Sequence, residues 1–271
     1  MRAIMRKTIL VTGSTDGIGL ETAKMLINRE QHVIIHGRNI EKVQQVEQSL
    51  REMKSGKVES LVADLSSPNA VKQIVMEITE RFNHLDVIIN NAGVYATPNP
   101  RTKEGLDVRF AVNTIAPYLL TRELLPLLGD TGRVVNLSSA AQTTVNTSAL
   151  LGNKPLSDGE AYAQSKLALT MWSRAIGLKL KNTGPMLVSV NPKSFLGSKM
   201  VKDAYGVAGG DIRLGADILT RAALSEEFAQ AHGMYFDNDI EAFAPPHPDA
   251  LDQSKTQQII DTIELILSKL Y

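Results

Sequence analysis

Tyr162 and Lys166 are the residues whose types and spacing most directly suggest chemistry. They are four positions apart in a segment rich in helix formers, Glu160 to Leu169, so they share one helical face. A phenol titrates near pH ~10 in water, too high for an efficient acid or base at neutral pH. A cation about 4 Å away contributes ~4 kcal/mol at an effective dielectric of ~20, or ~3 pKa units. The pair predicts a proton-transfer unit, although this spacing also arises by chance on exposed helices.

A glycine-rich turn near the start of the chain is a second candidate site. Gly13, Gly17 and Gly19 stand between an apolar strand pattern and a helical pattern. Such glycines let the backbone approach a pyrophosphate at a helix N-terminus, and no Lys-Ser or Lys-Thr follows to make a Walker loop. We therefore expect a dinucleotide to bind this turn. The expected contacts are Gly13, Ser14, Thr15, Asp16, Gly17, Ile18 and Gly19.

The residues after the next strand pattern indicate which dinucleotide to expect. A carboxylate about twenty residues after the glycines would select the 2′-hydroxyl of NAD. Gly37-Arg38-Asn39 offers no Asp or Glu, and Arg38 is available for a 2′-phosphate. We expect NADP, with NAD the less favoured cofactor, and place Arg38 and Asn39 in the site. The alternative is an exposed arginine that opens the next helix.

Two further segments end strand patterns with small or polar residues. Asn90-Asn-Ala-Gly93 would let backbone and cofactor meet closely, and its amides can hold polar ring or ribose groups. Val134 to Ser139 ends in two serines without the His–Asp partners of a hydrolase or the Gly-x-Ser-x-Gly elbow. Their hydroxyls therefore favour hydrogen bonding to a substrate oxygen over nucleophilic attack.

The elements that must position these residues alternate between short β-branched runs and longer helical patterns. Apolar strand cores such as Val33 to Ile35 suit strands covered on both faces. The pattern predicts one α/β domain over residues 1–271, a Rossmann-like doubly wound parallel sheet of about seven strands. The expected strands are Thr8 to Thr12, His32 to His36, Val58 to Ala63, Val87 to Asn90, Arg133 to Leu137, Leu187 to Asn191 and Met234 to Phe236.

The later part of the chain departs from this alternation. Residues 192–232 hold helical patterns and glycines without a clear strand, and they favour a small insertion that covers the substrate. The alternative is a surface excursion without function. The apolar residues from Gln257 to Leu270 have helical spacing and predict a helix packed on the core, with a subunit contact as the second choice.

Composition excludes several kinds of function. Lys plus Arg and Asp plus Glu number 29 each, so no net field attracts nucleic acid or an anionic membrane. The absence of cysteine excludes disulfides and thiolate catalysis and suits a reducing cytoplasm. No apolar stretch approaches the ~20 residues of a membrane span. We expect a cytoplasmic protein without a metal, and expect its five histidines to be surface or loop residues.

Taken in chain order, these motifs resemble the short-chain dehydrogenase/reductase family over roughly residues 8 to 192. The motifs are Thr12-Gly13-x-x-x-Gly17-Ile18-Gly19, Asp64, Asn90-Asn91-Ala92-Gly93, Asn113, Ser139 and Tyr162-x-x-x-Lys166. Among its subgroups the chain is similar to the branch of retinol dehydrogenases and the WW-domain oxidoreductase. The interval from Ser139 to Tyr162, Asn191-Pro192 followed by Ser194, and His247 to Leu251 carry that likeness.

The resemblance implies a role for each of these residues. Tyr162 would exchange a proton with a carbonyl or alcohol oxygen, Lys166 would bind the nicotinamide ribose and lower the pKa of Tyr162, and Ser139 would hold the reacting oxygen. Asn113 would anchor a water that connects Lys166 to solvent. The remaining positions that the resemblance implies for the cofactor site are Asp64 and Leu65 at the adenine edge, Asn91, Ala92 and Gly93 beside the adenine ribose, and Pro192 after the sixth strand.

Two positions depart from the family pattern. Pro-Gly usually follows the sixth strand, whereas this chain has Pro192-Lys193. The lysine side chain could reshape the pocket, contact the cofactor phosphates, or point away. Asp16 stands in the phosphate turn where many NADP-preferring members have a neutral or basic residue, which weakens the electrostatic preference for NADP.

The leading hypothesis is an NADP(H)-dependent carbonyl reductase or alcohol dehydrogenase for a small, largely apolar substrate. The alternative is a catalytically silent dinucleotide-binding module that senses redox state or binds a protein; Lys193 is the feature that favours it. An epimerase or dehydratase on the same fold is disfavoured by the short C-terminal part. Apolar helices at Ile115 to Leu128 and Tyr162 to Leu180 predict a homodimer or tetramer, with a monomer as the alternative.

Overall fold

The computed structural model describes residues 6–270, except for the side chains of residues 204 and 205. Within this range the chain forms one eight-stranded sheet in the order β3-β2-β1-β4-β5-β6-β7-β8. All neighbouring strands are parallel except β7 and β8. The strands are β1 (Thr8–Val11), β2 (His32–Gly37), β3 (Lys57–Val62), β4 (Val87–Asn90), β5 (Arg133–Leu137), β6 (Met186–Asn191), β7 (Met234–Asp237) and β8 (Ala242–Ala244).

The seven predicted strands are confirmed, with each end within one residue of its expected position. Strand β8 was missed because three residues beside a proline-rich segment give no periodic signal. It pairs antiparallel with β7 through a turn at residues 238–241. The predicted doubly wound α/β sheet is confirmed.

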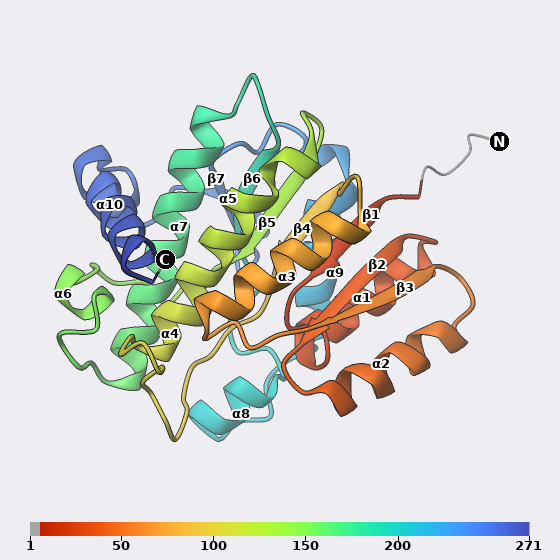
Figure 1. Ribbon diagram of the computed structural model, residues 1–271, viewed down its shortest axis with the longest axis horizontal. Coiled ribbons are helices and arrows are strands. Elements are labelled where there is room, and N and C mark those ends of the chain that lie inside the picture. The colour runs from red at the N-terminus through yellow and green to blue at the C-terminus, as the bar shows by residue number, and fades with distance from the viewer. Residues whose placement is uncertain (1–5, 271) are drawn as a thin grey trace.

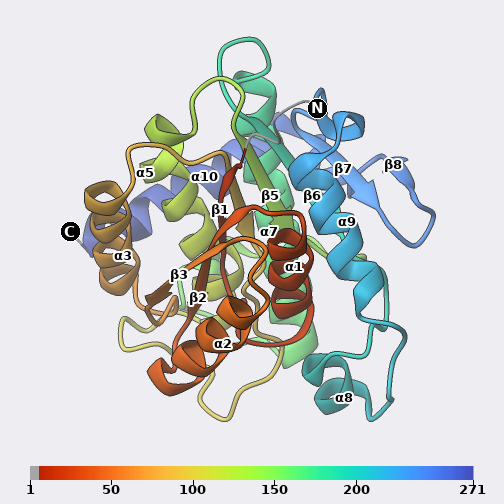
Figure 2. The same ribbon diagram turned by 90° about the vertical axis from the view of Figure 1, so that its right-hand side faces the viewer.

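Helices cover both faces of this sheet, as Figures 1 and 2 show. Alternate residues of one strand face opposite layers: Leu10 belongs to one apolar cluster, and Ile9 and Val11 belong to the other. The first layer holds α3 (Pro68–Arg81), α5 (Ala116–Leu128), α7 (Asp158–Lys179) and α10 (Gln253–Lys269), and the second holds α1 (Gly17–Asn28), α2 (Ile40–Glu52) and α9 (Arg213–Leu224).

Short helical segments connect these layers to the loops. They are α4 (Val108–Phe110), the π-helix Ala111–Ile115, α6 (Thr147–Leu150), α8 (Lys199–Tyr205), and the 3₁₀ turns Glu226–Phe228 and Pro248–Ala250.

Helix α9 packs on α1 and contributes Ile218 and Leu219 to the core. The predicted insertion at 192–232 is therefore narrower than expected, because residues 213–224 belong to a layer of the sheet. Within the range 192–232, residues 192–212 are the part that lies outside the layers.

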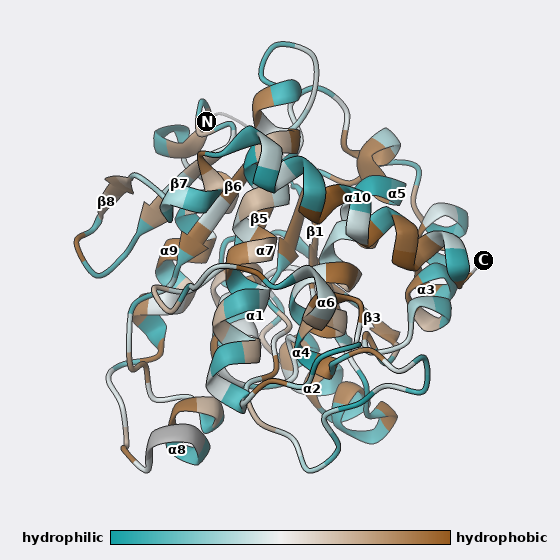
Figure 3. Cartoon of the chain, turned by 90° about the vertical axis from the view of Figure 1, so that its left-hand side faces the viewer, coloured by the Kyte–Doolittle hydropathy of each residue, from teal (hydrophilic) through white to brown (hydrophobic). Residues whose placement is uncertain are grey.

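The C-terminal helix α10 covers part of the apolar surface of α5 and α7, on which a subunit contact was expected. Its buried residues Ile259 and Ile263 join the core cluster beside α7, as predicted. Glu264 of α10 accepts hydrogen bonds from Tyr118 and from Arg122 of α5, the latter at 2.6 Å. Figure 3 shows polar and apolar residues alternating along α10 where it lies against α7. This part of the apolar surface of α5 and α7 is thus buried within the chain.

Candidate active site

The topology places the candidate site at the carboxyl ends of β1 and β4. The chain runs from β1 outward to β3, then restarts on the other side of β1 at β4 and continues to β7. In an open α/β sheet this switch point leaves a crevice that binds ligands. Gly13 follows β1 there, and Asn91 and Gly93 follow β4.

Close packing explains why glycines occupy two positions of the turn after β1. Gly13 has a φ of 63°, and a Cβ there would lie 2.8 Å from the Cα of Ala92. A Cβ on Gly19 would lie 2.4 Å from both the Nδ2 of Asn91 and the carbonyl oxygen of Gly13. Any larger residue would force this turn away from the segment after β4.

Hydrogen bonds join the same two segments. The Nδ2 of Asn91 donates to the carbonyl oxygens of Thr12 at 2.9 Å and Gly13 at 3.0 Å. The hydroxyl oxygen of Thr12 accepts from the backbone N–H groups of Asn91 at 3.0 Å and Ala92 at 3.1 Å. Asn91 therefore stabilises the glycine turn.

The predicted residues of the turn differ in what they present to the crevice. The hydroxyl of Ser14 is buried and donates to the carbonyl oxygen of Val11 at 2.8 Å, so its side chain faces the protein. The Thr15 methyl packs against Gly37: a Cβ added to Gly37 would lie 2.6 Å from the Cγ2 of Thr15. The first amides of α1, beginning at Ile18, have no acceptor within the helix and can donate to an anion.

Asp16 is the N-cap of α1, and its carboxylate is paired. Its Oδ1 accepts from the N–H of Gly17 at 2.8 Å, and its Oδ2 accepts from the Nζ of Lys42 at 2.6 Å. The hydrogen bond from Lys42 is the main cause that lowers the pKa of Asp16. Asp16 was expected to weaken the electrostatic preference for NADP; Lys42, in the first turn of α2, balances its charge.

The residues expected at the adenosine end lie on the loops after β2 and β3. Arg38 is exposed and makes no hydrogen bond or ion pair with another described residue. Asn39 caps α2, with its Oδ1 accepting from the N–H of Lys42 at 2.8 Å. Asp64 is exposed and accepts from the N–H of Ser66, and Leu65 is buried.

Tyr162 and Lys166 lie on consecutive turns of α7. A capping box formed by Ser157 and Glu160 starts this helix one turn before Tyr162 and fixes the helical register. The Nζ of Lys166 lies 5.7 Å from the centroid of the Tyr162 ring and donates to the carbonyl oxygen of Leu137 at 2.6 Å. Burial lowers the pKa of Lys166 to about 7.

The two serines after β5 have different environments. Ser138 is buried, with its hydroxyl 2.7 Å from that of Thr170, so it serves the packing of α7. Ser139 is only half-buried, and its Oγ accepts from the N–H of Ala141 at 3.1 Å. Its carbonyl oxygen also accepts a hydrogen bond from the Tyr235 hydroxyl at 3.1 Å. Ser139 is therefore the more exposed of the two serines, and its role in holding the reacting oxygen stays a prediction.

Asn113 lies in the π-helix that precedes α5, a distortion often found at functional sites. Its Oδ1 accepts from the N–H of Val94 at 2.8 Å, and its Nδ2 donates to the carbonyl oxygen of Val94 and to the hydroxyl of Ser165. A Cβ on Gly93 would lie 3.6 Å from both the Asn113 Oδ1 and the Lys166 Nζ. The amide and the ammonium group thus converge on the strand end after β4.

Pro192 is buried, and its carbonyl oxygen accepts from the Asn238 side chain at 2.9 Å. Lys193 keeps a positive φ of 112°, although glycine is the residue that adopts such a conformation without strain. Its Nζ lies 4.0 Å from a carboxylate oxygen of Glu241, in the turn between β7 and β8. The sequence left open whether the lysine reshapes the pocket, contacts the cofactor phosphates, or points away. In the structure its side chain points toward the acidic turn between β7 and β8.

Several residues around the crevice were not singled out from the sequence. The ring of Tyr95 lies 5.1 Å from that of Tyr162, and the Met200 methyl lies near Gly93.

His36 is buried in β2 and bonded to Gly13, and His32 is buried in the same strand. The expectation that all histidines lie on the surface or in loops was therefore wrong. The strand expected from His32 to His36, covered on both faces, already contained the signal for their burial.

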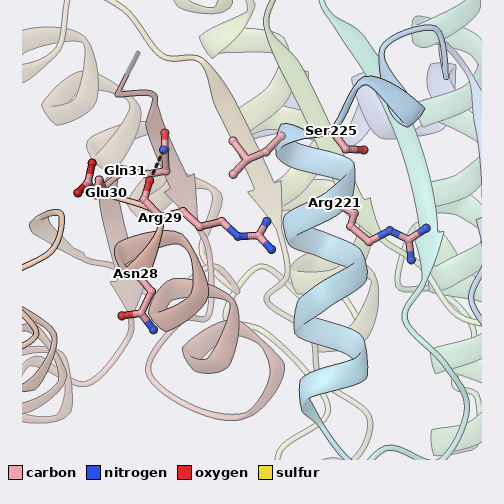
Figure 4. A pocket seen from close by; sticks show the side chains of 7 residues that line it. Asn28, Arg29, Glu30, Gln31, Arg221 and Ser225 are labelled. Carbon is pink, nitrogen blue, oxygen red and sulfur yellow. Dashed lines mark hydrogen bonds between the residues drawn. The ribbon is translucent and has the colours of Figure 1, made fainter. Parts of the chain in front are cut away.

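A hollow of about 550 Å³ opens at the other end of the sheet and holds none of the predicted site residues (Figure 4). It lies between the carboxyl ends of α1 and α9.

Between residues 6 and 270, no group of three or more His, Cys, Asp or Glu side chains is arranged to hold a metal. Of the helices in the described part of the chain, none has the length and hydropathy to cross a membrane.

A doubly wound sheet with a glycine turn at its switch point defines a dinucleotide-binding α/β protein. Comparison with known proteins defines the family. A family model described as short chain dehydrogenase matches residues 7–205. The short-chain dehydrogenase TIC 32 A, chloroplastic, of Brassica napus is 33% identical over 253 residues, covering 84% of this chain and 79% of the relative.

Two other proteins extend this result. Human retinol dehydrogenase 13 is 29% identical over 273 residues, covering 93% of this chain and 82% of the relative. The structure of a short chain dehydrogenase from Shigella flexneri 2a str. 301, complexed with NADP, superposes with a TM-score of 0.69 at 25% identity, covering 88% and 99% of the two chains. The chain belongs to the short-chain dehydrogenase/reductase family, in the retinol-dehydrogenase-like branch, and is an oxidoreductase acting on CH–OH or C=O groups.

Proposed function

We propose that the protein is an NADP(H)-dependent oxidoreductase that interconverts a carbonyl and an alcohol on a small, largely apolar substrate, with Tyr162 as its acid and base. The observation that carries the proposal is the convergence of Lys166 and Asn113 on Gly93, beside Tyr162 and at the switch point of the sheet. When bound, the nicotinamide cofactor would supply or accept the hydride.

The shape of the crevice fits a dinucleotide. Gly13 and Gly19 let the glycine turn pack closely against the segment after β4, and the first turn of α1 offers backbone N–H groups to a pyrophosphate. Asp64 and Leu65 would border the adenine, and Ala92 and Gly93 would approach the ribose. Ser14 would contribute its backbone alone, because its hydroxyl is turned inward.

The side chains around Tyr162 can each perform one part of proton transfer. The Tyr162 hydroxyl would give its proton to a carbonyl oxygen, or take one from an alcohol, and the Ser139 hydroxyl would donate a hydrogen bond to the same oxygen. Lys166, with a pKa lowered to about 7 by burial, can both hold and release a proton near neutral pH. Asn113 would orient a water that connects Lys166 to solvent.

The charges at the adenosine end support NADP over NAD. Arg38 is an exposed guanidinium without a partner among the described residues, suited to bidentate binding of a phosphate. Lys42 neutralises Asp16, so the carboxylate does not oppose a second phosphate. A structural relative of this chain was solved with NADP.

The walls near Tyr162 support an apolar substrate. Tyr95 packs against the Tyr162 ring, and Met200 of α8 reaches the space above Gly93. These side chains offer an aromatic face and a flexible thioether in place of charges. The human relative is named for retinol, which is largely apolar, and this supports the same class of substrate here.

One assay, applied to wild type and to a Tyr162 variant, tests the function. The protein is incubated with NADPH and a panel of aldehydes, ketones and quinones, and the loss of NADPH absorbance is followed for wild type and Tyr162→Phe. Loss of the general acid should lower kcat by ~10²–10⁴-fold. Unchanged turnover by Tyr162→Phe would refute the mechanism, and binding without turnover on every substrate would support the sensor alternative.

The cofactor preference has its own test. Arg38→Asp should weaken NADPH binding and shift the preference toward NADH, because the carboxylate repels a 2′-phosphate and can bind a 2′-hydroxyl. Equal NADPH affinity in the two proteins would contradict the assignment of Arg38.

Assembly and location stay proposals. A homodimer or tetramer would need surfaces other than the part of α5 and α7 that α10 buries, and sedimentation of the purified chain measures this. A reducing cytoplasm suits a chain without cysteine, which cell fractionation tests; the Brassica napus relative is named as chloroplastic.

A further inference from the structure

His36 is a buried histidine that no step of the proposed reaction uses. It lies on β2, between β1 and β3, and its side chain is 3% exposed. Its Nδ1 lies 3.2 Å from the backbone nitrogen of Gly13, and its Nε2 lies 3.1 Å from the carbonyl oxygen of Ala63. One imidazole ring therefore bridges the turn after β1 and the turn after β3.

These two partners determine which ring nitrogen holds the proton. The N–H of Gly13 can only donate, so Nδ1 must be bare, and the carbonyl of Ala63 can only accept, so Nε2 must be protonated. Burial lowers the pKa of His36 to about 4, and the hydrogen bond to Ala63 and the nearby Asp64 carboxylate oppose this only in part. The ring is therefore neutral at physiological pH.

The backbone of His36 holds the same turn. Its N–H donates to the hydroxyl of Ser14 at 2.9 Å, and its carbonyl oxygen accepts from the N–H of Ser14 at the same distance. Ring and backbone thus hold two successive residues, Gly13 and Ser14. On the other side, Ala63 immediately precedes Asp64, which borders the expected adenine site.

We propose that His36 is a positioning residue for the dinucleotide, whose Nε2-protonated ring sets the spacing between the phosphate turn at Gly13 and the adenosine wall at Ala63. The proposal rests on the proposed function, because the spacing matters for a cofactor bound between these turns. Tyr162 and Lys166 lie beyond β4, on the other side of β1. Loss of the ring should therefore weaken cofactor binding without slowing the reaction of the bound complex.

Two variants of His36 and a matched control test the proposal. His36→Ala removes both bonds of the ring. His36→Asn keeps an acceptor at the position of Nδ1, because its amide oxygen is also bonded to Cγ, and it cannot titrate. His32→Ala is the control: His32 lies on the same strand and is buried, but at its amino end, where its Nε2 lies 3.0 Å from a carboxylate oxygen of Glu59.

The readouts are the Kd for NADP⁺ and NADPH by calorimetry, and kcat and the cofactor KM with a substrate found in the panel. His36→Ala should raise Kd and KM roughly tenfold or more, as expected for the loss of both hydrogen bonds of the ring, with kcat within about twofold of wild type. His36→Asn should recover only part of the affinity, because it keeps the acceptor for Gly13 and loses the donor to Ala63. His32→Ala should match wild type.

Other outcomes separate the two proposals. Absence of dinucleotide binding by wild type would overturn the proposed function. Tight binding by wild type with an equal Kd for His36→Ala would overturn only the role of His36, as would a fall in kcat as large as the rise in KM. If His36→Ala does not fold, ¹⁵N NMR of wild type still decides. The signal of the His36 ring is identified as the one that disappears in His36→Asn. A proton on its Nδ1 would refute the proposal.

Discussion

Lys166 brings a cation into the core beside the proposed proton donor, and its replacement should separate stability from activity. The side chain is buried, and its pKa falls from 10.5 to about 7. That difference corresponds to ~5 kcal/mol against the charged form in the folded protein. Lys166→Met keeps an unbranched chain of similar length without this cost.

The gain is partly offset by a lost hydrogen bond. The Nζ of Lys166 donates to the carbonyl oxygen of Leu137 at 2.6 Å, and leaving a buried acceptor without a partner costs about 1–3 kcal/mol. We expect Lys166→Met to be more stable than wild type by roughly 2 kcal/mol near pH 7, or ~5 °C in Tm. Its kcat/KM should fall by at least ~10²-fold, because the group expected to act with Tyr162 in proton transfer is lost.

The pH dependence of stability isolates the cause. Between pH 7 and 10.5 the unfolded chain holds a proton on Lys166 that the folded protein has released. Stability therefore rises with pH through this window, by about 3 kcal/mol between pH ~7 and ~9.5 for this one group. Urea unfolding at both pH values measures the rise, which Lys166→Met should lose.

Lys179→Met provides the control, since Lys179 is an exposed lysine in the last turn of the same helix. It should keep the pH dependence of wild type. If Lys166→Met is no more stable than wild type near pH 7 and shows the same rise with pH, the buried ammonium is not a cost to folding and the reasoning is wrong.

Three other substitutions test individual parts of the structure. Lys193→Gly should raise the free energy of unfolding by about 1 kcal/mol in urea titration, because glycine adopts the φ of 112° without strain; a loss of stability would show that the lysine side chain matters more than the backbone. Gly13→Ala should lower stability by roughly 2 kcal/mol and abolish NADP⁺ binding in calorimetry, since its Cβ would lie 2.8 Å from the Cα of Ala92. Arg109 is buried, and its Nη2 lies 2.6 Å from the Oδ2 of Asp107. Arg109→Leu should cost about 3 kcal/mol in thermal unfolding, because it leaves this mostly buried carboxylate without its ion pair; a change below ~1 kcal/mol would refute this role for the ion pair.

The strands and the motif order could be read from local patterns. Seven strands were correct to within one residue because a strand covered on both faces must be continuously apolar, as in Val33 to Ile35. The helical spacing of Tyr162 and Lys166 and the glycines at 13 and 19 follow equally local rules. The sheet edge beyond β7 does not, because strand β8 is three residues long and depends on pairing with its neighbour.

The sequence by itself determined which residues can do chemistry and whether each lies on a strand, a helix or a turn. It could do so because the periodicity of strands and helices is set within a few residues. Tertiary packing decided their environment. It turned Ser138 inward and left Ser139 near the crevice, paired Asp16 with Lys42, and placed the ring of His36 between two loops. Such relationships join residues far apart in sequence, and burial and hydrogen bonding arise only when the strands are assembled.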